Sequence, residues 1–243
     1  AVIVRKNIAV QSFNYSSYLP LGKPEIIIEN LHNWGVDEIV LLVIDRDNKG
    51  PDFDLLKKLK NYKISTPLIY GGGIQTEEQA KKVINYGVER IVLDSIIYEN
   101  INNLEKIYQS LGSQALILSL PLIQENNKIN FYNHKKKEFQ YKEKNIKEIL
   151  NKKIFSEIVL INVNGEGSSE GFDKLLFEYM QKITKTPFIL FGGISNTKQV
   201  IDCLKYENVS AVIIGNSLNY REHSIYHLKK DISDSFIRKH NIK

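Results

Sequence analysis

The sequence predicts an α/β protein folded as a (β/α)8 TIM barrel made of two similar halves. Three observations lead to this prediction. Eight short apolar segments alternate with eight helical segments along the 243 residues. The stretch TPLIYGGGI at 66–74 returns as TPFILFGGI at 186–194. No Pro- or Ser-rich linker divides the chain, so we expect one barrel domain over residues 1–243.

The apolar segments have the length and the continuous hydrophobicity of parallel strands that are buried on both faces. The expected strands are Val2–Val4, Ile39–Ile44, Leu68–Tyr70, Ile91–Leu93, Ala115–Leu120, Ile158–Val163, Phe188–Phe191 and Ala211–Ile214. The expected helices are Glu25–Trp34, Phe53–Lys60, Glu77–Tyr86, Ile101–Leu111, Lys144–Asn151, Phe172–Ile183, Thr197–Tyr206 and about Ser224–Ser233. A doubly wound parallel sheet is the alternative arrangement for such a pattern.

The repeat extends beyond the glycine-rich stretch. DEIVLL at 37–42 matches SEIVLI at 156–161, and VERIVLDS at 88–95 answers VSAVIIGN at 209–216. A solenoid would repeat every 20–50 residues, whereas this period is about half of the chain. The pattern therefore indicates a duplicated half-barrel.

One segment departs from the strand–helix alternation. Residues 125–142 alternate apolar and polar side chains around a polar turn, which predicts a β-hairpin after the fifth strand. Much of the excess positive charge, +5 for the whole chain, lies in HKKKEFQYKEKNIKE at 134–148. Such a run is typical of a solvated loop and helix face; a nucleic-acid site is the alternative, but no recognisable binding module accompanies it.

Composition excludes several classes of protein. There is no apolar run long enough for a membrane helix, and no signal peptide opens the sequence. The single cysteine, Cys203, cannot form an internal disulfide, which fits a cytoplasmic protein, and we interpret it as a core residue. The histidines and carboxylates do not cluster at ligand spacing, so we expect neither a metal nor another cofactor.

Active sites of such barrels lie at the carboxyl ends of the strands, where the glycine-rich turns fall. Turns without side chains let a phosphate approach backbone N–H groups at the start of the next helix. The alternative is that the glycines only permit tight turns. The candidate phosphate-binding residues are Gly72, Gly73 and Ser95 in the first half, and Gly167, Gly192, Gly193, Gly215 and Asn216 in the second.

The stretches GVDEIVLL, TPLIYGGGI, ERIVLDS, LGSQALIL, SEIVLINVNGEGSSEGFD, TPFILFGGI and SAVIIGNSLNYRE together resemble the cyclase subunit of imidazole glycerol phosphate synthase. The related isomerase shares most of them, but LGSQALIL and the spacing around GEGSSEGFD favour the cyclase. The resemblance covers essentially the whole chain. It implies a twofold barrel with two phosphate sites, and a glutaminase partner in a heterodimer.

At two important positions this sequence differs from the cyclase that it resembles. The cyclase uses two aspartates, at the ends of strands one and five, as general acid and base. Ile3 and Pro121 stand at those positions, and neither can transfer a proton. Asp94 and Glu166 are the remaining candidates for catalytic residues at the mouth, although exposed carboxylates often serve only to solvate loops or cap helices.

In the cyclase, charged residues at the amino ends of the strands gate an ammonia channel against the glutaminase. Glu38, Arg90 and Glu157 match three members of this ring, and the fourth, an arginine, would precede Ala1. The alternative is that these charges only pair at the surface.

The apolar first strand and the SFNYSSYLPLGKP segment at 12–24 resemble a divergent branch that accompanies a glutaminase and a sugar amidotransferase in making acetamidino sugars for surface polysaccharides or flagella. Three hypotheses follow. The chain passes nitrogen toward a phosphorylated or nucleotide-linked sugar, or it is a cyclase-lyase of histidine biosynthesis with relocated catalytic residues, or it is a non-catalytic scaffold that activates the glutaminase.

Overall fold

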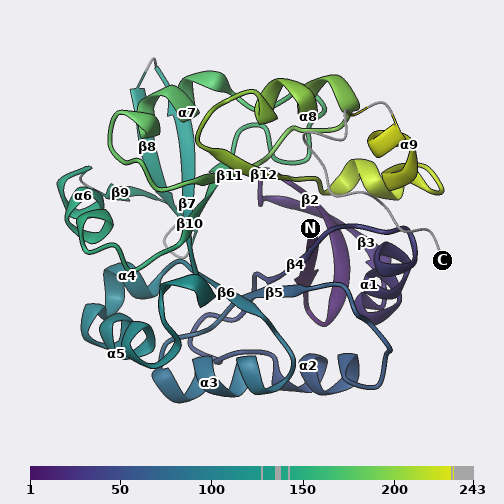
Figure 1. Ribbon diagram of the computed structural model, residues 1–243, viewed down its shortest axis with the longest axis horizontal. Coiled ribbons are helices and arrows are strands. Elements are labelled where there is room, and N and C mark those ends of the chain that lie inside the picture. Colours follow the sequence, from purple (N-terminus) through teal and green to yellow (C-terminus); the bar gives the residue numbers. More distant parts are fainter. Residues whose placement is uncertain (127, 135–137, 142, 231, 233–243) are drawn as a thin grey trace.

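A computed structural model describes residues 1–126, 128–134, 138–141, 143–230 and 232. It confirms the predicted (β/α)8 architecture, with a ring of parallel strands surrounded by helices (Figure 1). The barrel strands, in spatial order, are β1 (Val2–Arg5), β4 (Ile39–Val43), β5 (Leu68–Gly71), β6 (Arg90–Leu93), β7 (Leu116–Glu125), β10 (Glu157–Asn162), β11 (Phe188–Phe191) and β12 (Val209–Ile213). Each lies within a few residues of its predicted position.

The first and last strands meet without a regular ladder in the described part of the chain. The Ala1 amino group instead donates a hydrogen bond of 2.7 Å to the Ile214 carbonyl. This seam is therefore the weakest join of the barrel wall, since every other neighbouring pair of strands is joined by a parallel ladder.

Helices cover the outside of the ring (Figure 1). They are α1 (Pro24–Asn33), α2 (Phe53–Leu59), α3 (Glu77–Asn85), α4 (Ile96–Glu99), α5 (Ile101–Leu111), α6 (Glu143–Asn151), α7 (Lys174–Gln181), α8 (Thr197–Leu204) and α9 (Ser224–Lys230). The predicted helices are present, α4 is additional, and the end of the last predicted helix lies outside the described residues. No helix in the described ranges is long and apolar enough to cross a membrane.

The internal repeat is visible in the hydrogen bonds that begin α3 and α8. Thr76 accepts a hydrogen bond from the Gln79 N–H in the first half, as Asn196 does from the Gln199 N–H in the second. Both glutamine side chains reach back to the N–H before the cap, at 2.8 Å in each half. Equivalent contacts 120 residues apart are expected of a duplicated half-barrel.

Two hairpins are added at the carboxyl mouth of the barrel. β7 continues past the wall and pairs antiparallel with β8 (Lys128–Asn133), which pairs with β9 (Glu138–Tyr141). The hairpin predicted after the fifth strand is thus confirmed and gains a third strand; part of the basic run lies outside the described residues. The other hairpin, β2 (Ile8–Phe13) and β3 (Ser17–Gly22), was not predicted.

Alternate residues of each barrel strand face inward and outward. The outward side chains pack under the helices in one large cluster. The inward side chains form a second cluster that contains, among others, Ile3, Val40, Ile117, Val159 and Phe191. The barrel interior is therefore apolar over its middle layers, and polar groups are placed at its two ends.

Candidate functional site

The first glycine-rich turn follows β5. Gly72 and Gly73 have φ of +136° and +72°, which side chains disfavour. A Cβ at Gly73 would lie 2.5 Å from the Gly50 carbonyl oxygen, so the backbone segments approach closely here. Ser95, at the end of β6, accepts a hydrogen bond of 2.9 Å from the Gln75 side chain. Gly72, Gly73, Gln75 and Ser95 all line one cavity.

The second turn, after β11, repeats this geometry. Gly192 and Gly193 have φ of +110° and +88°, and a Cβ at Gly193 would overlap the Gly171 carbonyl. The Asn216 amide differs from its counterpart Ser95, because it donates to the Ser12 carbonyl at 2.7 Å and accepts from the Ser12 N–H at 3.3 Å. The β2–β3 hairpin is therefore attached to the second cradle.

The cavity at the mouth has a volume of about 420 Å³. Asp94 lines it from the end of β6 and accepts a hydrogen bond of 3.3 Å from the Ser119 hydroxyl of β7. Burial raises the pKa of Asp94 to about 7; the Ser119 hydrogen bond acts in the opposite direction, and the nearby charge of Glu99 raises the pKa further. A carboxyl group with such a pKa in a cavity is able to give and take protons at neutral pH.

Glu166, the other candidate, has a different environment. It is 2% exposed, and its carboxylate accepts from the Ser12 hydroxyl at 3.0 Å and from the Tyr15 N–H at 3.1 Å. Its backbone carbonyl accepts from the Asn14 N–H at 2.9 Å. Burial raises the pKa of Glu166, while these hydrogen bonds lower it. Glu166 thus fastens the tip of the β2–β3 hairpin.

The other polar residues of this loop support its backbone. Asn162 accepts a hydrogen bond from the Gly165 N–H at 3.0 Å, and Asn164 accepts one from the Gln124 N–H at 3.1 Å. Both side chains brace the turn, which explains amide residues at these positions without a catalytic role.

The two positions that hold aspartates in the cyclase are apolar in the structure as well as in the sequence. Ile3 is 4% exposed and belongs to the inner aliphatic cluster. Pro121 is buried in β7, opposite Ile161 of β10. Two residues earlier on β7, Ser119 lines the cavity, so Pro121 lies on the same face of the strand. Neither position supplies a titratable group to the mouth.

At the opposite end of the barrel the three predicted gate residues are in contact. The Arg90 guanidinium bridges Glu38, at 2.6 Å, and Glu157. The Ser210 hydroxyl donates a further hydrogen bond to Glu157. The three charged side chains are between 16% and 31% exposed, so they are largely shielded from water but can still be reached from the amino end of the barrel.

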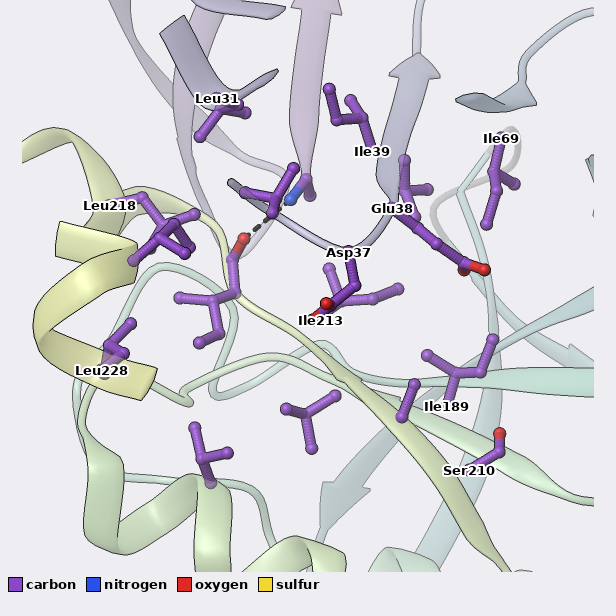
Figure 2. Close-up of a pocket in the computed structure, with 18 of the residues that line it drawn as sticks. Leu31, Asp37, Glu38, Ile39, Ile69, Ile189, Ser210, Ile213, Leu218 and Leu228 are labelled. Atoms are coloured by element: carbon purple, nitrogen blue, oxygen red, sulfur yellow. Dashed lines mark hydrogen bonds between the residues drawn. The ribbon is translucent and has the colours of Figure 1, made fainter. Parts of the chain in front are cut away.

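A cavity of about 490 Å³ lies beside this ion-pair cluster. In Figure 2, Leu31, Leu218 and Leu228 border one side of it, and Glu38, Ile69, Ile189 and Ser210 lie on the other.

The two cavities share strands. We call the cavity beside the ion-pair cluster the lower cavity and the cavity at the carboxyl mouth the upper cavity. Glu38, just before β4, and Val40 line the lower cavity, and Leu42 of β4 lines the upper one. Along β10, Glu157 and Ile161 line the lower and upper cavity respectively, with buried Val159 between them. Inward residues on a strand are two positions apart, so about one layer of aliphatic side chains separates the cavities.

A comparison with protein families matches residues 4–224 to the family described as "Histidine biosynthesis protein". The chain belongs to this family. The matched region contains both glycine-rich turns, the internal repeat, Asp94, Glu166 and the Glu38–Arg90–Glu157 cluster, while Ile3 and most of α9 lie outside it.

Individual relatives in the family are distant. A protein of Leptospira borgpetersenii, provisionally named imidazole glycerol phosphate synthase subunit HisF, is 24% identical over 90% of this chain and 88% of its own. A Vibrio vulnificus protein, provisionally named subunit hisF2 of the same synthase, is 26% identical over 92% and 83%. The Methanococcus maripaludis synthase subunit HisF is 23% identical over 96% and 94%.

The aromatic residues at the mouth were not predicted from the sequence. Tyr15, Tyr18, Tyr132 and His134 line the upper cavity from the two hairpins. Their signal in the sequence is a clustering of Tyr and His within residues 12–24 and 125–142, which alone does not distinguish them from core residues. Among the described residues, no three His, Cys, Asp or Glu side chains come together as a metal site.

Proposed function

We propose that this chain is the synthase-type subunit of a glutaminase complex, which receives ammonia at the amino end of its barrel and supports nitrogen transfer at the carboxyl end. The observation that carries the proposal is the pair of cavities on shared strands, with the Glu38–Arg90–Glu157 cluster at one and Asp94 at the other. The apolar layer between them suits neutral ammonia, because moving ammonia out of water costs much less free energy than moving an ammonium ion.

In this proposal the acceptor is a phosphorylated or nucleotide-linked sugar. A phosphate would bind at Gly72, Gly73 and Ser95, and Asp94 would act as the acid or base near the reacting atoms. Glu166 would act through the hairpin that it holds. The resemblance to the acetamidino-sugar branch supports this acceptor class, as does the absence of a carboxylate at Ile3 and Pro121.

A cyclase of histidine biosynthesis is the second candidate, because the relatives carry the name of that synthase. It requires Asp94 to replace two aspartates. A scaffold that only activates the glutaminase is the third; it predicts full activation even when the upper cavity is blocked.

The test is a two-component assay in which the chain is mixed with a purified glutaminase subunit. We expect a one-to-one complex in which glutamine hydrolysis is faster than for the glutaminase alone. Arg90→Met should impair use of glutamine nitrogen while leaving use of added ammonium salt intact; Lys81→Met, which breaks an exposed pair with Glu77, is the matched control. Failure to form the complex would refute the proposal.

A further inference from the structure

The two halves of the barrel differ at the mouth although their sequences repeat. Gly72, Gly73 and Ser95 of the first half line the upper cavity. In the second half, a Cβ at Gly167 would lie 2.8 Å from the Phe13 ring and would overlap the Ser12 carbonyl. The β2–β3 hairpin therefore packs on the second cradle and leaves the first one open.

The side of the cavity formed by the two hairpins is aromatic. The Tyr15 and His134 rings are 4.6 Å apart between centroids, and the Tyr132 and His134 rings are 5.0 Å apart. The Arg5 guanidinium lies 4.5 Å from the centre of the Tyr18 ring. Burial lowers the pKa of His134 to about 4, so its imidazole is neutral at pH 7. We name Tyr15, Tyr18, Tyr132 and His134 the aromatic wall.

One polar atom of the wall is unsatisfied. The Tyr15 hydroxyl is buried and has no hydrogen-bond partner among the residues that the structure describes. Burial raises its pKa well above the usual value, and the negative charges of Glu166 and Asp94 act in the same direction. The phenol therefore keeps its proton and can only gain by donating to an acceptor. Glu166 fixes its position by accepting from the Tyr15 N–H.

The hairpin occupies the second cradle, so this side of the cavity offers no glycine-rich turn to a second phosphate. A neutral ring with a carbonyl oxygen or a ring nitrogen suits it better. Such a ring would stack on the aromatic wall and accept from Tyr15. A cavity of about 420 Å³ is within the usual range for a small-molecule ligand.

We propose that the aromatic wall binds a planar heterocycle of a ligand that is phosphorylated at one end only, with its phosphate in the first cradle and its heterocycle accepting from Tyr15. This deepens the proposed function, and it rests on the upper cavity being the acceptor site. It differs from the expectation of a ligand with a phosphate at each end, because the hairpin covers the second cradle.

Calorimetric titration of the chain without any partner tests the proposal with three probes: uridine 5′-monophosphate, ribose 5-phosphate and fructose 1,6-bisphosphate. We expect the nucleotide to bind most tightly. Tyr15→Phe should weaken its binding about tenfold, the loss of one buried hydrogen bond, and leave ribose 5-phosphate within about twofold. Because that variant loses only a hydroxyl, no folding defect is expected, and its melting temperature checks this.

Two matched charge-adding variants compare the cradles. Ser95→Asp should weaken the binding of both monophosphates at least tenfold. Ser195→Asp, which adds a charge at the second glycine-rich turn without touching the hairpin, should change neither by more than about twofold. The proposal is overturned if the bisphosphate binds most tightly and Ser195→Asp weakens it, if Tyr15→Phe leaves nucleotide binding unchanged, or if no probe binds. These results do not depend on a glutaminase, so they are distinguishable from a failure of the proposed function.

Discussion

Replacing Asp94 with Asn should stabilise the protein at neutral and alkaline pH and change it little in acid. Burial raises the pKa of Asp94 from 3.8 to about 7, so the folded chain holds a proton that the unfolded chain releases. Below pH 3.8 the carboxyl group is protonated in both states and does not reduce the free energy of unfolding. As the pH rises from 3.8 through 7, the free energy of unfolding falls, because the unfolded chain releases the proton first. At about 1.4 kcal/mol per pH unit, the loss approaches 4 kcal/mol by pH 8.

Asparagine cannot ionise, and it keeps an amide that can pair with the Ser119 hydroxyl. Urea unfolding of both proteins, followed by circular dichroism between about pH 4.5 and 8.5, measures the difference. The gain in unfolding free energy should grow from a small value at the acid end to roughly 4 kcal/mol at the alkaline end. Asp54→Asn, at an exposed position of α2, is the matched control and should show no such growth. A difference that is independent of pH would refute the reasoning.

Three further predictions concern the rest of the site. Arg90→Met should lower the unfolding free energy by about 2 kcal/mol, because Glu38 and Glu157 lose a half-buried cation; equal stability in urea would contradict it. Glu166→Ala should speed amide hydrogen exchange at the hairpin tip, since Ser12 and Tyr15 lose their acceptor, whereas Glu166→Gln should not. Gly193→Ala should cost about 3 kcal/mol or more through strain and overlap, and Gly87→Ala, which has a similar φ and open space, only about 1–2 kcal/mol from strain; equal costs would show that the close approach at Gly193 is unimportant.

Much of the fold could be predicted because it depends on local patterns. Strands such as Phe188–Phe191 are buried on both faces, so they appear as continuous apolar runs with definite limits. The β2–β3 hairpin could not be predicted in this way. Its second strand is largely exposed and contains Pro20, and its position depends on Glu166, more than 150 residues away.

The candidate site was predictable in part for the same reason. Asp94 and Glu166 were both found from their places at strand ends, but only packing separates their roles. Asp94 lines the cavity, whereas Glu166 is covered by the hairpin. The aromatic wall comes from two hairpins that are far apart in sequence, so no local pattern could bring Tyr15 and His134 together.

The central claim is that this barrel keeps the ion-pair cluster at its amino end but does not carry out the cyclase reaction, since its two aspartate positions are Ile3 and Pro121. The most direct test supplies the purified chain with the bis-phosphorylated histidine-pathway intermediate and ammonium salt, beside an ordinary cyclase as the positive control. We predict no turnover above the uncatalysed rate. Turnover near that of the control, abolished by Asp94→Asn, would contradict the claim and make the chain a cyclase with a relocated acid.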